Sequence, residues 1–299
     1  MDVFSDVLRR LQLRGSSYFC SDFHDSWGID EPASERGQFH IVIRGDAWLS
    51  VNDEPEVLLK EGDIVVLPHG DAHWLASSPK SAKHPAIEVV TAIQSGQSPF
   101  EGDVPGATLL CGYFEYDDRT PHPLLNSLPP LVYLSTDDLN DSGWLLSSVH
   151  SLSIKSRNPG PGREALVDRL TEVVLIEIFR LWLEQHSEES GLFSALCDER
   201  ISKAIYAIHG EPGMSWTVAS LAKESGMSRT IFAQEFHDKV GQPPMVYLTN
   251  WRMAIARDLL KSGESVLGVA MSLGYQSEAS FSKAFKKVLG ITPGVIRKG

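Results

Sequence analysis

The first third of the chain alternates short apolar runs with turn residues. Three such runs occupy residues 38–43, 47–51 and 64–67, and Gly, Asp and Asn residues lie between them. Several short strands at this spacing are typical of a β-sandwich or a β-barrel. The pattern therefore predicts a β-rich domain over residues 15–115.

The pattern changes along the rest of the chain. Pro, Gly and Ser are frequent in residues 80–107 and 121–130, which predicts loops there. From about Ser142 the apolar spacing becomes helical, and a strongly apolar helix is predicted over residues 163–185. Because its apolar arc is wide, we expect this helix to pack either on a second subunit or on its own barrel.

Two segments near the C-terminus repeat each other at an interval of 48 to 49 residues. In each copy a glycine that can adopt a left-handed conformation ends a short helix, and a serine, Ser228 or Ser277, can cap the next helix. Two phenylalanines four residues apart would pack inward from that second helix. Each copy is therefore predicted to be a helix–turn–helix. The equivalent pairs are Ala222 and Ala270, Gly226 and Gly274, Phe232 and Phe281, Phe236 and Phe285, Gly241 and Gly290, and Pro244 and Pro293.

The outer face of each second helix is polar. A polar helix face with a buried aromatic side suits the major groove of DNA. A continuous helix over residues 244–260 would hold the two units at a fixed separation, so that they enter major-groove faces about 34 Å apart. The outer faces carry Arg229, Thr230, Ala233, Gln234 and His237 in the first copy, and Glu278, Ala279, Ser282, Lys283 and Lys286 in the second.

The net charge of −12 argues against nucleic-acid binding until its distribution is considered. Residues 198–299 contain 13 Lys and Arg against 9 Asp and Glu, whereas residues 1–197 contain 14 against 30. The C-terminal segment is thus mildly basic and compatible with DNA binding. Three cysteines exclude a disulfide framework, and no apolar run is long enough to predict a membrane span.

Three stretches of the C-terminal segment match one family. They are SLAKESGMSRTIFAQEFHDKVGQPPMVYL, WRMAIARDLL and VAMSLGYQSEASFSKAFKKVLGITPGVIR, the last being the most diagnostic. Through them residues 198–297 resemble the AraC/XylS family of bacterial transcription regulators. Ala233 and Glu278 depart from a polar, basic reading surface, so we expect the two helices to contribute unequally to specificity. The resemblance implies DNA binding by Arg229, Thr230, Ala233, Gln234, Glu278, Ser282 and Lys283.

A second motif lies in the β-rich segment. Gly62, Pro68, Gly70 and His73 follow the spacing of the second cupin motif, in which a strand rises to a Pro-x-Gly turn and the next strand returns a histidine to the barrel interior. Residues 3–115 thus look like the cupin-type sensor domains that are fused to AraC/XylS DNA-binding domains.

The first cupin motif is largely missing. Gln38 and His40, which share one side of a strand, replace its two histidines. A catalytic metal requires three or four ligands, and here only His40 and His73 are good candidates, with Gln38 or His69 as poor third ligands. These residues therefore favour an effector pocket, or a pair of hydrogen-bonded histidines in the core, over a divalent-metal site.

Cys20 and Cys111 lie near the start and the end of the predicted barrel. This tract is similar to that of regulators that respond to reactive chlorine species, which carry cysteines at those two places. Oxidation could join the two thiols or form a sulfenic acid. We favour the alternative that both are buried apolar residues, because the sequence places no thiolate-stabilising cation beside either.

Together these features predict an α+β multidomain protein. A cupin-like sensor and dimerisation domain is expected over residues 1–186, a linker over 187–197, and an all-α DNA-binding domain with two helix–turn–helix units over 198–299. The helices of residues 140–186 resemble the family's dimerisation region.

The expected function is that of a sequence-specific transcription regulator whose cupin domain senses a small molecule or an oxidant. It would act in the cytoplasm, at the nucleoid, without enzymatic activity. Its implied partners are promoter DNA, RNA polymerase and a second copy of the chain. The alternative is a cupin metalloenzyme, with its metal at His40 and His73 and an accessory DNA-binding domain.

Overall fold

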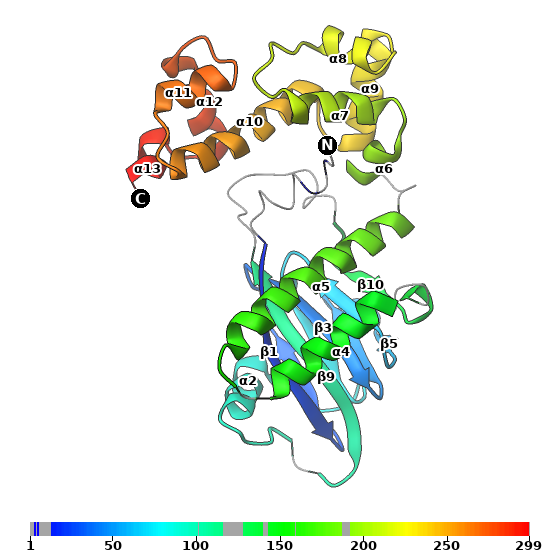
Figure 1. The fold of residues 1–299 in the computed structure, drawn as a ribbon. Coiled ribbons are helices and arrows are strands. Elements are labelled where there is room, and N and C mark those ends of the chain that lie inside the picture. Colours follow the sequence, from blue (N-terminus) through cyan, green and yellow to red (C-terminus); the bar gives the residue numbers. More distant parts are fainter. Residues whose placement is uncertain are drawn as a thin grey trace. The chain divides into compact units, whose positions relative to one another are not determined.

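The computed structural model describes Val3, Ser5 and residues 13–100, 102–115, 128–139, 143–158, 160–186 and 192–298. These residues belong to two compact units, one β-rich and one helical, which meet in sequence at residues 184 and 185 (Figure 1). No helix in the described part of the chain is long and apolar enough to cross a membrane.

The β-rich unit contains two five-stranded sheets, with strand orders β1-β9-β3-β6-β10 and β5-β4-β7-β2-β8. All paired strands are antiparallel except β2 and β8. Side chains of both sheets, such as Phe19 and Leu75, form one apolar core, as the predicted barrel requires. The strands are β1 (Arg14–His24), β2 (Gly28–Glu31), β3 (Gly37–Arg44), β4 (Ala47–Val51), β5 (Val57–Leu59), β6 (Ile64–Leu67), β7 (His73–Ala76), β8 (His84–Pro85), β9 (Pro105–Glu115) and β10 (Val132–Leu134).

Two helices, α4 (Gly143–Arg157) and α5 (Arg163–Gln185), pack on the outer face of the first sheet (Figure 1). The rings of Phe114 on β9 and Phe179 on α5 meet edge to face at 5.8 Å. Gly15 on β1 has no side chain because a Cβ there would overlap Thr171 of α5. One apolar side of α5, which includes Val174, Leu175 and Ile178, is therefore buried on its own barrel.

The loop expected over residues 80–107 is wrong in part. Residues 86–94 form helix α2 (Ala86–Gln94), and β9 already begins at Pro105. Ala86 and Val89, three residues apart, are buried in the barrel core. The helical spacing of these apolar residues is short, and the many Pro, Gly and Ser residues around it led to the prediction of a loop.

The helical unit contains two helix–turn–helix pairs, α8–α9 and α11–α12, joined by α10 (Figure 1). Residues 192–197, expected in the linker, instead form α6, which packs against α7 and α9. The helices are α6 (Leu192–Cys197), α7 (Ile201–Gly210), α8 (Val218–Glu224), α9 (Arg229–Val240), α10 (Pro244–Lys261), α11 (Val266–Ser272), α12 (Glu278–Leu289) and α13 (Pro293–Lys298).

Local sequence accounts for both tight turns. Gly226 and Gly274 have φ angles of 64° and 77°, in the left-handed region that glycine adopts without strain. The hydroxyl of Ser228 accepts the backbone N–H of Ile231, and Ser277 caps α12 in the same way. The two predicted turns are therefore built by the residues that the repeat singled out.

Candidate DNA-binding surface and sensor site

The two second helices, α9 and α12, are anchored alike. Phe232 and Phe236 of α9 are fully buried with ring centroids 5.5 Å apart, and Phe281 and Phe285 of α12 repeat both features. Burying two aromatic rings on one side of a helix fixes which side faces solvent. The predicted inward face is thus confirmed in both copies.

The predicted reading residues all lie outside the core. Arg229, Thr230 and Gln234 on α9 are exposed, and Ala233 is half-buried. The Gln234 amide donates hydrogen bonds of 2.9 and 3.0 Å to the carboxylate of Asp238, one turn further on. The amide nitrogen of Gln234 is thus engaged within the helix, whereas its amide oxygen takes no part in these bonds.

The second of the two predicted reading helices, α12, carries exposed positive charge. Glu278 and Lys283 are exposed, and Ser282 is half-buried. Among the described residues, no acidic partner forms an ion pair with Lys283 or Lys286. On α9, by contrast, Lys239 is paired with Asp198 at 2.8 Å. Unpaired lysines on an exposed helix suit phosphate contacts.

In the barrel, His40 of β3 and His73 of β7 form a buried pair. Their Nε2 atoms lie 2.8 Å apart, and Nδ1 of His73 lies 2.8 Å from the carbonyl oxygen of Asp71. A carbonyl only accepts, so His73 carries its proton on Nδ1 and His40 donates from Nε2. Burial lowers the pKa of both histidines, and the neighbouring His73 lowers the pKa of His40 further.

This geometry does not bring together a metal-ligand set. Two nitrogens on one tetrahedral metal would stand roughly 3.3 Å apart with the ion between them, whereas the histidine pair is in direct contact. Gln38 donates to the carboxylate of Glu31 at 3.0 Å, and His69 contacts the carbonyl of Leu128. The part of the chain that the structure describes contains no group of three or more His, Cys, Asp and Glu placed to hold a metal.

Cys20 and Cys111 lie on neighbouring strands but on opposite faces of the sheet. Cys111 stands opposite Phe19 and faces the barrel core, whereas Cys20 stands opposite Leu110 and faces α4. A disulfide requires Cβ atoms that point toward each other. The sheet register therefore does not favour a direct disulfide between these two thiols.

The two thiols differ in environment. Burial raises the pKa of Cys111 well above its usual value. Burial also raises the pKa of Cys20, but a hydrogen bond from Arg157 Nε to its sulfur, 3.2 Å long, opposes that rise. Arg157 is the cation that the sequence did not reveal, because it lies 137 residues away on α4.

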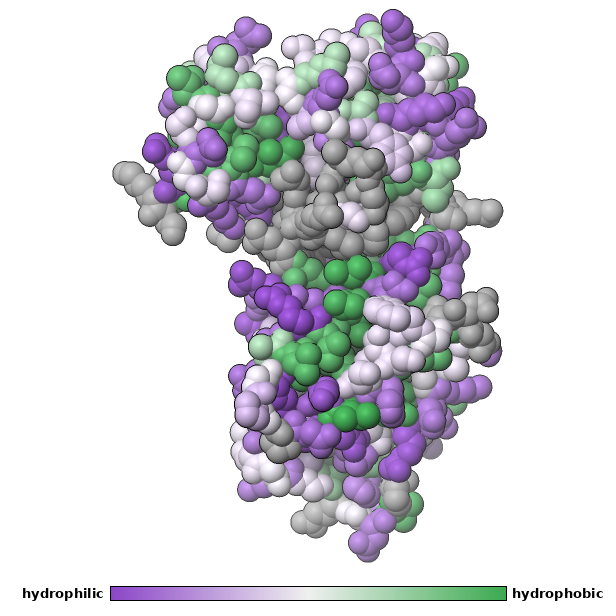
Figure 2. Space-filling model, in the orientation of Figure 1, coloured by the Kyte–Doolittle hydropathy of each residue, from purple (hydrophilic) through white to green (hydrophobic). Residues whose placement is uncertain are grey.

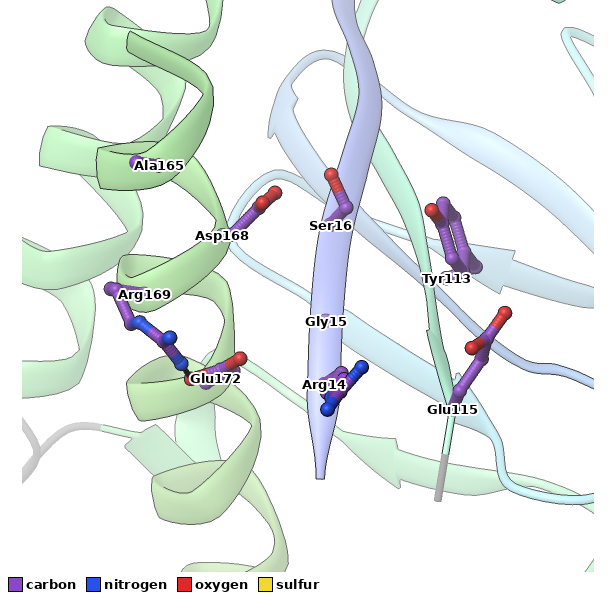
Figure 3. Close-up of a pocket in the computed structure, with 9 residues that line it drawn as sticks. All are labelled: Arg14, Gly15, Ser16, Tyr113, Glu115, Ala165, Asp168, Arg169 and Glu172. Carbon is purple, nitrogen blue, oxygen red and sulfur yellow. Dashed lines mark hydrogen bonds and ion pairs between the residues drawn. The ribbon is translucent and has the colours of Figure 1, made fainter. Parts of the chain in front are cut away.

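A pocket of about 450 Å³ opens between α5 and the neighbouring strands β1 and β9 (Figure 3). Asp168 reaches from α5 toward Ser16 on β1. Arg169 is paired with Glu172, but Arg14 and Asp168 form no ion pair with any described residue. Gln38, His40 and His73, at which an effector pocket was predicted, do not line this space.

Comparison with known proteins agrees with both units. A family model described as Cupin matches residues 2–184, and one described as Helix-turn-helix domain matches residues 221–299. A Streptomyces lividans protein described as an AraC-like transcription regulator is 32% identical, over 100% of this chain and 98% of its own. The HTH-type transcriptional regulator MtrA of Neisseria gonorrhoeae is 30% identical, with the same shares covered.

A third relative carries a more specific name. The RCS-specific HTH-type transcriptional activator RclR of Escherichia coli is 29% identical, over 100% of this chain and 98% of its own. The matches span the barrel and the helical unit together, so the resemblance is not confined to the DNA-binding segment. The chain belongs to the AraC-like family of helix-turn-helix transcription regulators with an N-terminal cupin domain.

Proposed function

We propose that this regulator reads promoter DNA with α9 and α12 and that its barrel adjusts the reading in response to an effector. The observation that carries the proposal is the pair of identically anchored helices, each with an exposed polar face. Two such helices on one chain would contact two successive major-groove faces. Selection of bound sequences from random DNA by the full-length protein tests this, and failure to enrich any motif would overturn it.

The residues proposed to meet DNA are those on the exposed sides of the two helices. Base edges are assigned to the side chains near each helix start, and phosphates to the lysines of α12. We also propose RNA polymerase as a partner at the promoter, in the cytoplasm. The proposed contacts are Arg229, Thr230, Ala233, Gln234, Glu278, Ser282 and Lys283.

We propose that residues 1–186 act as the sensor and dimerisation domain. Leu166 and Val173, two turns apart on the outer side of α5, are each 43% exposed although apolar. Figure 2 shows hydrophobic side chains gathered over this helix. A second copy of the chain would cover them. Double substitution L166E/V173E should convert a dimer into a monomer in sedimentation, and an unchanged mass would contradict this interface.

One effector class is an oxidant, because the relative RclR is named for reactive chlorine species. Cys20 is the proposed target, because the hydrogen bond from Arg157 to its sulfur opposes the rise in pKa that burial causes. Hypochlorous acid would transfer its oxygen to that thiolate, giving a sulfenic acid and chloride. Trapping with dimedone should label Cys20, and a Cys20–Cys111 disulfide in the folded protein would contradict the sheet register.

The other effector class is a small molecule, and the pocket at β1 is its proposed site. Arg14 and Asp168, which form no ion pair with any described residue, complement the two charges of a small zwitterion such as a dipeptide. Alanyl-alanine should raise the melting temperature of the wild type but not of Asp168→Asn. Equal stabilisation by the dipeptide with both ends blocked would reject this ligand class. The metalloenzyme alternative gains no support from His40 and His73, which contact each other.

A further inference from the structure

The two helix–turn–helix pairs are connected at two places. The first connection is α10, which runs from one pair to the other (Figure 1). The second is a contact between residues 211–216, which lead into α8, and residues 272–275, which end α11 and begin the turn before α12. We call this second connection, together with Arg252 of α10, the clasp.

Arg252 holds the first side of the clasp. Its Nε donates to the carbonyl oxygen of Pro212 at 2.7 Å, and its Nη2 donates to that of Met214 at 2.8 Å. The rigid guanidinium fork allows both bonds at once, which a lysine cannot reproduce. The same guanidinium lies 5.7 Å from the ring centre of Tyr275, on the other side of the clasp.

Tyr275 connects Arg252 to α12, the second helix proposed to read DNA. Its ring meets Phe281 of α12 edge to face, with centroids 5.5 Å apart. Phe281 is fully buried and fixes the orientation of α12. The loop before α8 is thereby linked through Arg252 and Tyr275 to the core beneath α12.

Two glycines let the backbones of the clasp touch. A Cβ on Gly213 would overlap the carbonyl oxygen of Ser272, and a Cβ on Gly274 would overlap the carbonyl oxygen of Gly213. Gly274 also has a positive φ of 77°, so its own conformation requires glycine. Gly213 has no such backbone requirement, and close approach alone accounts for it.

We propose that the clasp makes the regulator selective for the spacing between its two half-sites. The proposal rests on the proposed DNA reading by α9 and α12. A single connecting helix leaves freedom to bend and twist, and a second attachment removes it. One extra base pair shifts a half-site by about 3.4 Å and rotates it by roughly 35°. With the clasp intact, the two helix–turn–helix pairs cannot move to match the shifted half-site. With the clasp broken, they can.

Gly213→Ala tests the clasp without changing any charge. Gly210→Ala is its matched control, because a Cβ at Gly210, the last residue of α7, meets nothing within 4 Å. Arg252→Ala and Arg252→Lys open the clasp from the other side, the latter with the positive charge retained. Each full-length protein selects bound sequences from the same random DNA library, and the spacing between the two enriched blocks is counted.

Wild type and Gly210→Ala should enrich two blocks at one spacing. Gly213→Ala and both Arg252 variants should enrich the same blocks at several spacings, with at least a several-fold loss of preference for the wild-type spacing. A single unchanged spacing in all variants would overturn the clasp. If the wild type enriches no motif, or one block only, the proposed two-helix reading fails instead. Hydrogen exchange at α8 and α12 verifies that each variant is folded.

Discussion

Arg157 of α4 donates a hydrogen bond from Nε to the sulfur of Cys20 on β1, across 3.2 Å. Its two Nη atoms bind both carboxylate oxygens of Asp22, at 3.0 and 3.1 Å, so the guanidinium is held in place. These contacts tie the end of α4 to the sheet. They also make the reactivity of Cys20 depend on a residue far away in the sequence.

Replacing Arg157 should slow the chemistry of Cys20. In Arg157→Met the hydrogen bond and the charge that oppose burial are lost, so the pKa of Cys20 rises further. We expect alkylation of Cys20 by iodoacetamide at pH 8 to slow several-fold relative to the exposed Cys197. Cys111 is buried and would react only if the barrel opened, so it serves as a control for folding and should stay unlabelled. A Cys20 rate that does not change would show that the contact has no chemical effect.

The buried histidine pair should make the barrel sensitive to acid. Burial lowers the pKa of His40 and His73, so the folded pair stays neutral where unfolded histidines, with a pKa near 6.5, take up protons. The unfolded state then binds more protons, and stability falls as the pH falls through about 6.5. Melting temperatures at pH 7.5 and 5.5 should differ less in His40→Gln than in the wild type. The exposed His150→Gln should behave like the wild type, and an unchanged pH dependence in His40→Gln would reject the explanation.

Phe281→Ala should unfold the second helix–turn–helix pair. The ring is fully buried between Phe285 and Tyr275, and its removal leaves a cavity. Such truncations cost about 3–5 kcal/mol. Thermal or urea unfolding of the variant checks this, with the exposed Lys286→Ala as a control. Wild-type stability in Phe281→Ala would show that the inward face of α12 is assigned incorrectly.

Lys283→Ala should weaken DNA binding almost equally for all sequences. The exposed ammonium is assigned to a phosphate, and losing one phosphate contact lowers the slope of log K against log salt by about 1. Mobility shifts at several salt concentrations measure that slope. Lys60→Ala, an exposed lysine of the barrel unit, makes the same change in net charge and should leave the slope unaltered. Equal slopes for Lys283→Ala and the wild type would remove Lys283 from the interface.

Local sequence was enough to predict the helical unit. Serine caps, left-handed glycines and phenylalanines four residues apart act within one or two turns, so they predict α9 and α12 without knowledge of distant contacts. The long helix predicted over residues 163–185 likewise matches α5. In the barrel, strand pattern and turn residues were sufficient for β4 and β6, both of which are observed with the predicted bounds.

The features missed from the sequence depend on contacts between distant residues. The Arg157–Cys20 contact joins residues 137 apart, and Arg252 binds carbonyls 40 and 38 residues before it. The direct contact of His40 with His73 depends on how the two sheets face each other. No periodicity or motif carries that information, because it arises only when separate elements pack.

Methylation interference on a selected DNA site tests the central claim most directly. Dimethyl sulfate modifies guanine N7 in the major groove, where α9 and α12 are proposed to read base edges. The full-length protein should be blocked by methylation in two clusters on one face of the duplex, about 10 base pairs apart. Phe281→Ala should lose only one cluster. Interference in a single cluster for the wild type, or none, would contradict reading by two helices.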